Sequence, residues 1–398
     1  MIYVGIDWAR QRHYLVVLDG QGAQLHHQFV AHSAEALAAL AGTLARLEPD
    51  PAAVRVALEL HDGGLLAWLV AQGYSVYPLN PKSAERARDR YRPAGGKDDR
   101  TDAFVLADTL RTDGGALRPL RPTSGRAQEL LSWLGVRDGL VRERTTKMQQ
   151  VRAILDEWCP ELSALCNNLK CIWQRELLRA FPLQHDLAGV EAAQVAAACG
   201  RKLSACARTR LQAALAAACL PLPPGRREPL AWQVRELVAR IAELSEHIKQ
   251  IEQRLWALVA AHPRARLVGS LPVKGIVTRA TLLAVMEAGD DASWRALVAR
   301  WGVAPITRQS GKSRGVRRRR GCDHFVCQVL MQFAHCTAQV QGSWAQQMYR
   351  TKRAAGVEHF TALRQLANRW VKVLCAMWRH DTLYDEQLHH TNRLRAAA

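Results

Sequence analysis

Four carboxylates stand where a strand pair and a helix could bring them together. Asp7 follows the apolar segment 2–6, which predicts a strand, and Glu59 lies near the end of a second apolar segment. Asp99 and Asp102 are three residues apart at the start of an expected helix, so both point from one face. If the two strands are neighbours and the helix packs across them, all four carboxylates converge.

Converging carboxylates repel one another unless a divalent cation compensates them, and an all-oxygen ligand set suits Mg²⁺ or Mn²⁺. Two ions about 4 Å apart would clamp the attacking and leaving oxygens of a phosphodiester. Burying Glu59 inside an apolar strand costs free energy unless it coordinates something. The alternative is that Asp99 and Asp102 only favour the positive helix N-terminus, with Glu59 at a strand edge. Asp62 and Asp98 are reserve ligands.

Ser310 is a second candidate for chemistry, in an expected loop followed by Gly311 and Lys312. A serine hydroxyl is a poor nucleophile at neutral pH and needs a base, a metal or nearby cations. Arg308, Lys312 and the arginines that follow could stabilise charge on a phosphate under attack. Alternatively, the hydroxyls of this loop only bind phosphate. Ser313 competes with Ser310 on chemistry alone.

The net charge of +19 implies a polyanionic partner, either nucleic acid or a membrane surface. Basic residues are densest just beyond the serine, with glycines between them: Lys312, Arg314, Arg317, Arg318, Arg319 and Arg320. This composition predicts a mobile loop that contacts phosphates, not one face of a membrane helix. A merely solvated charge run is the alternative, and the neighbouring serine favours nucleic acid.

The ten cysteines are scattered and form no C-x-x-C pair. A zinc cluster at Cys322 and Cys327 with His324 and His335 lacks the usual ligand spacing, so buried thiols in a reducing compartment are favoured. No apolar stretch is long enough to cross a bilayer, and the N-terminus lacks the features of a signal peptide. We expect a cytoplasmic protein.

The elements that must position these residues begin with a strand-rich domain. Expected strands are 2–6, 13–18, 25–30, 54–60 and 74–79, and expected helices are 33–47, 64–72, 81–90 and 99–111. A meander of three strands followed by alternating helices and strands is an α/β pattern. Its element order is that of an RNase H-like fold.

Two long helices are expected beyond this domain, the first over 124–158. The second carries a regular apolar repeat: Val234, Leu237, Ile241, Leu244, Ile248, Ile251, Leu255 and Leu258. Its steps of three and four predict a coiled-coil seam. The helices could pair within one chain as an antiparallel hairpin, or equally between chains. A Cys- and Ala-rich helical insert separates them.

The segment around Lys274 resembles the turn of a helix-hairpin-helix, because it precedes an apolar helix over 278–286. Such a turn presents backbone N–H groups to a phosphate. Proline and glycine before a helix are also ordinary turn chemistry. The tail, 344–384, is expected to be helical and is rich in Arg and Trp.

Taken in order, these segments resemble a known family, the bridge-RNA-guided insertion-sequence transposases of the IS-one-ten type, also called DEDD transposases. The resemblance covers nearly the whole chain, and order and spacing together make it specific. Its carriers are 3–7, the strand ending at Glu59, 97–103, 270–272, 301–305, 309–311, Tyr349, Gly356, His359, 362–364, Ala367 and 384–385.

The resemblance implies a RuvC-like first domain with an acidic tetrad of Asp7, Glu59, Asp99 and Asp102. It implies that Ser310 is a nucleophile that forms a covalent phosphoserine link to DNA. It also implies an active site shared between protomers, with dimers and a tetrameric synapse held by the coiled coil. A structured guide RNA would select donor and target DNA by base pairing.

Three features depart from the family pattern. Val273 replaces the usual glycine of the hairpin turn, which puts phosphate binding there in doubt. The segment after the serine is unusually rich in arginine, with Cys322 where a polar residue is commoner. The insert 161–229 is longer than expected, and the sequence assigns it no function.

The sequence therefore predicts three parts: a metal-dependent RuvC-like domain (1–115), a helical connector with an insert (116–262) and a C-terminal transposase domain (263–398). The expected activity is site-specific DNA recombination, in which Ser310 attacks a phosphate and a 3′-hydroxyl of another strand reverses the step. One alternative is a hydrolytic nuclease or junction resolvase in which the carboxylates activate water. A non-catalytic nucleic-acid scaffold is the other.

Overall fold

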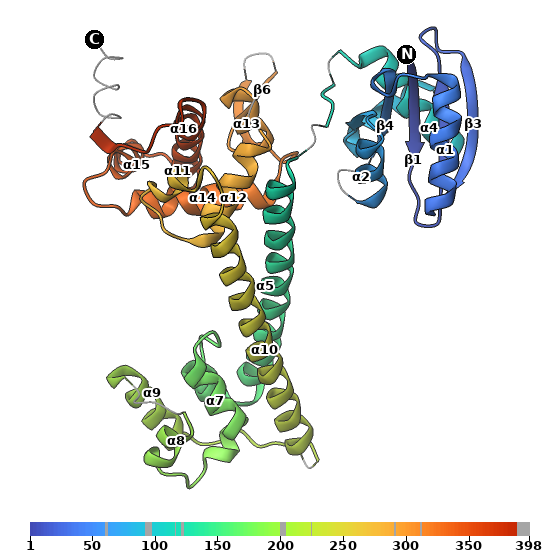
Figure 1. Cartoon of the computed structure of the whole chain (residues 1–398). Helices are drawn as coiled ribbons and strands as arrows, with labels where there is room; N and C mark the ends of the chain where they lie inside the picture. The colour runs from blue at the N-terminus through green and yellow to red at the C-terminus, as the bar shows by residue number, and fades with distance from the viewer. Residues whose placement is uncertain are drawn as a thin grey trace. The chain divides into compact units, whose positions relative to one another are not determined.

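The computed structural model describes residues 1–59, 63–91, 98–115, 117–120, 123–199, 204–223, 225–289, 292–310 and 313–387. They belong to two units, Met1–Pro122 and Thr123–Ala398 (Figure 1). The first unit is mixed α/β and the second is mostly helical, which confirms the expected fold class at this level. Among the described residues, no helix is long and apolar enough to span a bilayer.

A five-stranded sheet forms the centre of the first unit. Its strands are β1 (Ile2–Asp7), β2 (Arg12–Leu18), β3 (Gln24–Ala31), β4 (Val54–Leu58) and β5 (Ser75–Pro78). The spatial order is β3-β2-β1-β4-β5. β2 is antiparallel to both of its neighbours, β1 and β3, whereas β4 is parallel to both of its neighbours, β1 and β5. The first and fourth strands are therefore neighbours, as expected from the sequence.

Helices cover both faces of this sheet. Apolar side chains of one face pack with α1 (Ala34–Leu47) and α2 (Gly64–Ala71), and a short 3₁₀ turn (Pro51–Ala53) precedes β4. On the other face, α4 (Asp99–Asp113) packs against β1, β2 and β4, and α3 (Pro81–Tyr91) packs on α4. The strand ends next to Asp7 and Glu59 thus lie on the sheet that α4 covers, and α4 carries Asp99 and Asp102.

In the second unit, α5 (Gly125–Trp158) and α10 (Arg227–Ala260) form an antiparallel pair. Three ion pairs between the helices show that they run in opposite directions. From the first pair to the third, the residue number rises on α5 and falls on α10: Glu129–Arg254, Arg137–Glu252 and Glu143–Arg240. Most of the apolar repeat of α10 is buried: Val234, Ile241, Leu244, Ile248, Ile251 and Leu255.

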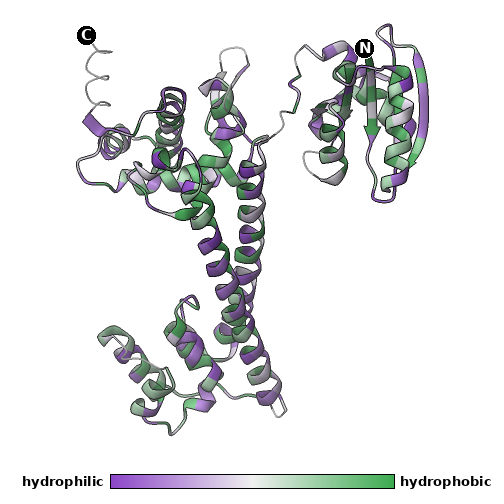
Figure 2. Ribbon diagram, in the orientation of Figure 1, coloured by the Kyte–Doolittle hydropathy of each residue, from purple (hydrophilic) through white to green (hydrophobic). Residues whose placement is uncertain are grey.

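Of the two pairings that the sequence left open, the structure shows the one within the chain. Figure 2 shows hydrophobic and hydrophilic residues alternating along both helices, as an amphipathic pair requires. Assembly of several chains through this apolar seam would require the helices to exchange partners.

The insert is helical, as expected. Its elements are α6 (Pro160–Leu165), α7 (Ile172–Ala180), a 3₁₀ turn (Gln184–Leu187), α8 (Ala192–Ala198) and α9 (Ala205–Ala216). They share a hydrophobic core with the adjoining ends of α5 and α10. All ten cysteines of the chain are free thiols. Burial raises the pKa of the Cys159 thiol, which makes it less reactive.

The rest of the second unit is one helical body with a β-hairpin. Its elements are α11 (Ala265–Gly269), α12 (Ile276–Glu287), α13 (Trp294–Arg300), β6 (Pro305–Ser310), β7 (Ser313–Arg318), α14 (His324–Ala338), α15 (Trp344–Ala354) and α16 (His359–His380). The tail expected to be helical thus forms two helices.

The core of this body continues into the ends of α5 and α10 through Leu130, Leu134, Leu255 and Val259. The connector and the C-terminal part therefore share one unit. The three-part division at residues 115 and 262 stays a prediction.

Candidate active site

Asp7 and Glu59 lie at the carboxyl ends of two neighbouring parallel strands. Ile6 of β1 is paired with Leu58 of β4, so Asp7 and Glu59 are the next residues in register. Gly5 faces α4, and strand alternation directs Asp7, two residues on, to the same side of the sheet. The sequence correctly predicted this juxtaposition.

Glu59 itself differs from expectation. It follows β4 instead of lying inside it, and its side chain is 37% exposed. The free-energy cost that we expected for a carboxylate buried in an apolar strand therefore does not arise. Water and a neighbouring cation solvate this group instead.

The three aspartates at the start of α4 differ in their surroundings. Asp98 is the N-cap, and its side chain accepts a hydrogen bond of 2.8 Å from the Thr101 N–H. Asp99 is exposed, whereas Asp102 is only 4% exposed. Asp99 and Asp102 do lie in the first turn of α4, as the alternative interpretation requires, and Asp98 caps the helix. The other reserve ligand, Asp62, lies outside the described residues.

Arg88 of α3 joins two of the four predicted ligands. Its Nε donates to Asp102 Oδ1 at 2.5 Å, and its Nη2 is 3.9 Å from Glu59 Oε1. In the described ranges, no three His, Cys, Asp or Glu side chains converge closely enough to hold a metal ion. Of the four predicted ligands, Glu59 and Asp102 are therefore linked through the Arg88 guanidinium, and the described residues show no group of three.

Ser310 is the last residue of a strand, not part of a loop. β6 and β7 are antiparallel, and Ser310 is paired with Ser313. Strand-forming residues such as Ile306, Thr307 and Val316 explain why this segment is extended. The predicted mobile arginine loop is likewise wrong in part, since Arg314, Arg317 and Arg318 belong to β7.

The described cations of the hairpin are accessible. Arg317, Arg318 and Arg320 are exposed, and Arg319 is partly buried. Lys312 lies outside the described residues, as do the side chains of Arg308, Ser310 and Arg314. The hairpin therefore presents exposed cations where β7 ends, at the opposite end of the strand pair from Ser310.

Comparison with known proteins assigns the chain to a family. The profile DEDD_Tnp_IS110, described as "Transposase", matches residues 4–160, and one described as "Transposase IS116/IS110/IS902 family" matches residues 265–350. The chain is 30% identical to "Insertion element IS900 uncharacterized 42 kDa protein" of Mycobacterium paratuberculosis, over 96% of this chain and 97% of that protein. It belongs to the IS116/IS110/IS902 transposase family.

Other relatives agree with this assignment. The transposase is 29% identical to "Mini-circle putative transposase for IS117" of Streptomyces coelicolor, over 100% of this chain and 98% of that protein. It is 33% identical to "Putative transposase y4uE" of Sinorhizobium fredii over 49% of this chain, and spans 55% of that relative's length. As an insertion-sequence transposase, it acts on DNA.

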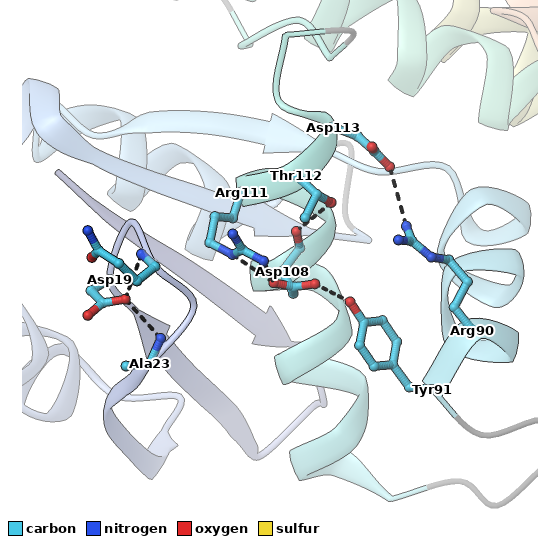
Figure 3. Close-up of polar contacts among 9 residues, drawn as sticks. Asp19, Ala23, Arg90, Tyr91, Asp108, Arg111, Thr112 and Asp113 are labelled. Carbon is cyan, nitrogen blue, oxygen red and sulfur yellow. Dashed lines mark hydrogen bonds and ion pairs between the residues drawn. The ribbon is translucent and has the colours of Figure 1, made fainter.

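Sequence reasoning missed a buried carboxylate in the transposase, Asp108 of α4. It is 5% exposed, and Figure 3 shows it between Tyr91 and Arg111. The Tyr91 hydroxyl donates to it, and Arg111 Nε donates at 2.8 Å. Burial and the bond to Asp108 raise the pKa of Tyr91. The available signal was an aspartate within the apolar stretch of a helix.

A histidine pair next to Asp7 was missed as well. His13 of β2 is 1% exposed, and its Nδ1 accepts a hydrogen bond of 3.3 Å from the Ala9 N–H. Its Nε2 is 2.9 Å from His32 Nδ1. Burial, and then the neighbouring His32, lower the pKa of His13. The pair thereby anchors the turn that follows Asp7.

The family carriers of the tail have structural roles. The Tyr349 hydroxyl lies 2.8 Å from His359 Nδ1 and joins α15 to α16. The Tyr384 N–H donates to Ser270 Oγ at 2.9 Å, which ties the end of the tail to α11. Val273, the departure at the turn, packs against the core. Lys274 beside it is exposed.

Gly302 is needed where the chain approaches α14. Its φ is +71°, and a Cβ there would lie 2.4 Å from Cys322 Sγ. Cys322 Sγ is 3.9 Å from His324 Nδ1. Cys322 therefore lies directly against the backbone of Gly302.

Proposed function

We propose that the first unit is an RNase H-like, RuvC-like domain whose acidic tetrad of Asp7, Glu59, Asp99 and Asp102 serves DNA cleavage. The observation that carries this proposal is the register of Asp7 and Glu59 at the ends of paired parallel strands. The strand order β3-β2-β1-β4-β5 supports it. Asp102 on the facing helix is the third element that such a site requires.

The residues fit a divalent cation by their chemistry. All four donors are carboxylates, and two of them already bind one cation, the Arg88 guanidinium. Mg²⁺ or Mn²⁺ bound there would polarise a phosphodiester and stabilise the charge of the departing oxygen. The protein's part would be to hold the carboxylates on one face, and the packing of α4 on β1 supports this role.

Ser310 is the proposed nucleophile. Its Oγ attacks the phosphorus and gives up its proton, the bond to one DNA oxygen breaks, and that oxygen takes up a proton and leaves as a hydroxyl. The phosphoserine keeps the energy of the phosphodiester, so a 3′-hydroxyl of another strand can attack it and release the serine. Placement at a strand end supports this role, because a paired strand fixes the backbone of the nucleophile.

Nucleic-acid contacts are proposed for the basic residues of the hairpin and of the α11–α12 turn. They are Lys274, Arg308, Lys312, Arg314, Arg317, Arg318, Arg319 and Arg320. A structured guide RNA is the proposed source of target choice, with the protein contacting mainly phosphates. A homodimer that assembles into a tetramer, with the carboxylates and serine of one active site from different protomers, completes the proposal.

A covalent intermediate is the decisive test. Purified protein, candidate flanking RNA, Mg²⁺ and labelled element-end DNA are incubated and run on a denaturing gel. A protease-sensitive shifted band is expected for the wild type and for Ser313→Ala. It should be lost in Ser310→Ala.

Two carboxylate variants extend this test. Asp7→Asn should abolish the adduct, whereas Asp113→Asn removes a charge from the exposed end of α4 and should leave it. Cut DNA without an adduct, unchanged in Ser310→Ala and lost in Asp7→Asn, would replace the proposal by a hydrolytic nuclease.

A further inference from the structure

Arg88 occupies the place where the proposed cation would be expected. Its guanidinium bridges carboxylates from two elements, Asp102 of α4 and Glu59 after β4. Asp102 is almost fully buried, so removal of its partner would leave a desolvated negative charge. The pairing is therefore more than an exposed surface ion pair, which contributes little.

The position of Arg88 is set by the helix that carries it. Ala84, Ala87, Arg88 and Tyr91 follow helical spacing and form one face of α3. Both alanines are buried in this face, at 2% and 7% exposure. Arg88 is thus on the packed side of the helix, whereas Arg86 and Arg90 are exposed.

Further contacts hold α3 against α4. The Tyr91 hydroxyl donates to buried Asp108, and the Tyr91 ring meets Phe104 edge to face at 5.6 Å. Arg90 Nη1 is 3.9 Å from Asp113 Oδ2. These contacts lie C-terminal to Arg88 on α3 and keep the helix that carries Arg88 packed on the helix that carries Asp102.

We infer that Arg88 is a resident counter-ion of the carboxylate site, and that it competes with the divalent cation for Asp102 and Glu59. This inference rests on the proposed metal-dependent function. A guanidinium and a divalent cation repel each other, so both cannot bind the same carboxylates without loss of affinity. Arg88 therefore stabilises the metal-free site and weakens metal binding.

Binding of Mn²⁺ to the full chain tests the inference without any activity measurement. Isothermal titration in the absence of nucleic acid compares wild type with Arg88→Gln. The variant should bind Mn²⁺ about tenfold more tightly or better, because a positive charge near the ion is removed.

Arg90→Gln is the matched control, because it removes the same charge two residues away on the exposed face of α3. Its dissociation constant should stay within about twofold of wild type, since exposed charges are screened. Equal affinities of wild type and Arg88→Gln, or weaker binding by the variant, would overturn the inference and leave the metal proposal standing. If neither the wild type nor any variant binds Mn²⁺, the metal proposal and the inference about Arg88 both fail.

Thermal unfolding provides a second measurement. Without metal, Arg88→Gln should melt below wild type and Arg90→Gln, and Mn²⁺ should raise its melting temperature more than theirs. Arg88→Lys covers the case in which the glutamine variant does not fold. Lysine keeps the charge but lacks the forked guanidinium that reaches two carboxylates. Arg88→Lys should therefore bind Mn²⁺ more tightly than wild type or Arg90→Gln, and less tightly than Arg88→Gln.

Asp102→Asn locates the competition. It removes the carboxylate that Arg88 binds at the shorter distance, so substitution of Arg88 in this background should tighten Mn²⁺ binding less than it does in the wild type. A gain as large as in the wild-type background would mean that Arg88 does not act through Asp102, and would overturn the inference.

Discussion

Gly5 of β1 lies directly against Ala103 of α4, so closely that a Cβ at position 5 would be 1.9 Å from the Ala103 carbonyl oxygen. No L side chain fits this contact, and the obstructing atoms are backbone. The helix that carries Asp102 can therefore approach the strand that carries Asp7 only because residue 5 is glycine.

Gly5→Ala should displace α4 and lower the free energy of unfolding by about 3 kcal/mol or more. Gly42→Ala on α1 is the control, since nothing lies within 4 Å of its added methyl group. It should be neutral or stabilising by up to about 1 kcal/mol. Urea unfolding followed by circular dichroism checks both, and equal stability of the two variants would contradict the close contact.

His13 should make the stability of the transposase depend on pH. Its pKa in the folded chain lies below 6.5, so as pH falls through 6.5 the unfolded chain takes up a proton that the folded chain does not. Stability should therefore decrease on acidification through this range.

Melting temperatures of wild type and His13→Gln at pH about 8 and about 5.5 measure this dependence. The loss on acidification should be smaller in the variant. His247→Gln, on the exposed side of α10, should keep the wild-type loss. Identical losses in all three proteins would show that His13 does not contribute.

Leu244→Ala tests the helix pair. Leu244 is 0% exposed in the seam between α5 and α10, so its truncation should cost about 2–5 kcal/mol. Lys249→Ala, at a side chain 65% exposed on the same helix, should change stability by less than about 0.5 kcal/mol. Because the seam closes within one chain, the loss of stability in Leu244→Ala should be the same at every protein concentration; a loss that changes on dilution would indicate that the seam pairs between chains.

Thr337→Val tests a buried polar contact in the C-terminal body. The indole N–H of Trp370 donates to Thr337 Oγ1 at 2.9 Å, and both residues are 0% exposed. Valine keeps the shape but removes the acceptor, so unfolding should become easier by about 1–3 kcal/mol. Thr351→Val, at an exposed position of α15, is the control and should be near neutral.

Much of the first unit was predictable because its signals are local. Strand alternation around Asp7 and helical spacing after Asp99 depend on neighbours in sequence, so the elements followed from the pattern. The juxtaposition of Asp7 with Glu59 was expected from the RNase H-like order of those elements. The apolar repeat of α10 likewise predicted a paired helix. It did not name the partner, because α5 within the chain and a second copy satisfy the same repeat.

Only the tertiary structure decided what surrounds the carboxylates. Arg88 reaches Asp102 across 14 residues, and Tyr91 reaches Asp108 across 17. No periodicity within α3 distinguishes an arginine that pairs with a buried carboxylate from one that faces water. Ser310 was placed in a loop because glycines and cations follow it, yet cross-strand pairing with Ser313 makes it a strand residue. The sequence by itself thus determined the elements and the candidate groups, whereas long-range contacts decided which charges meet.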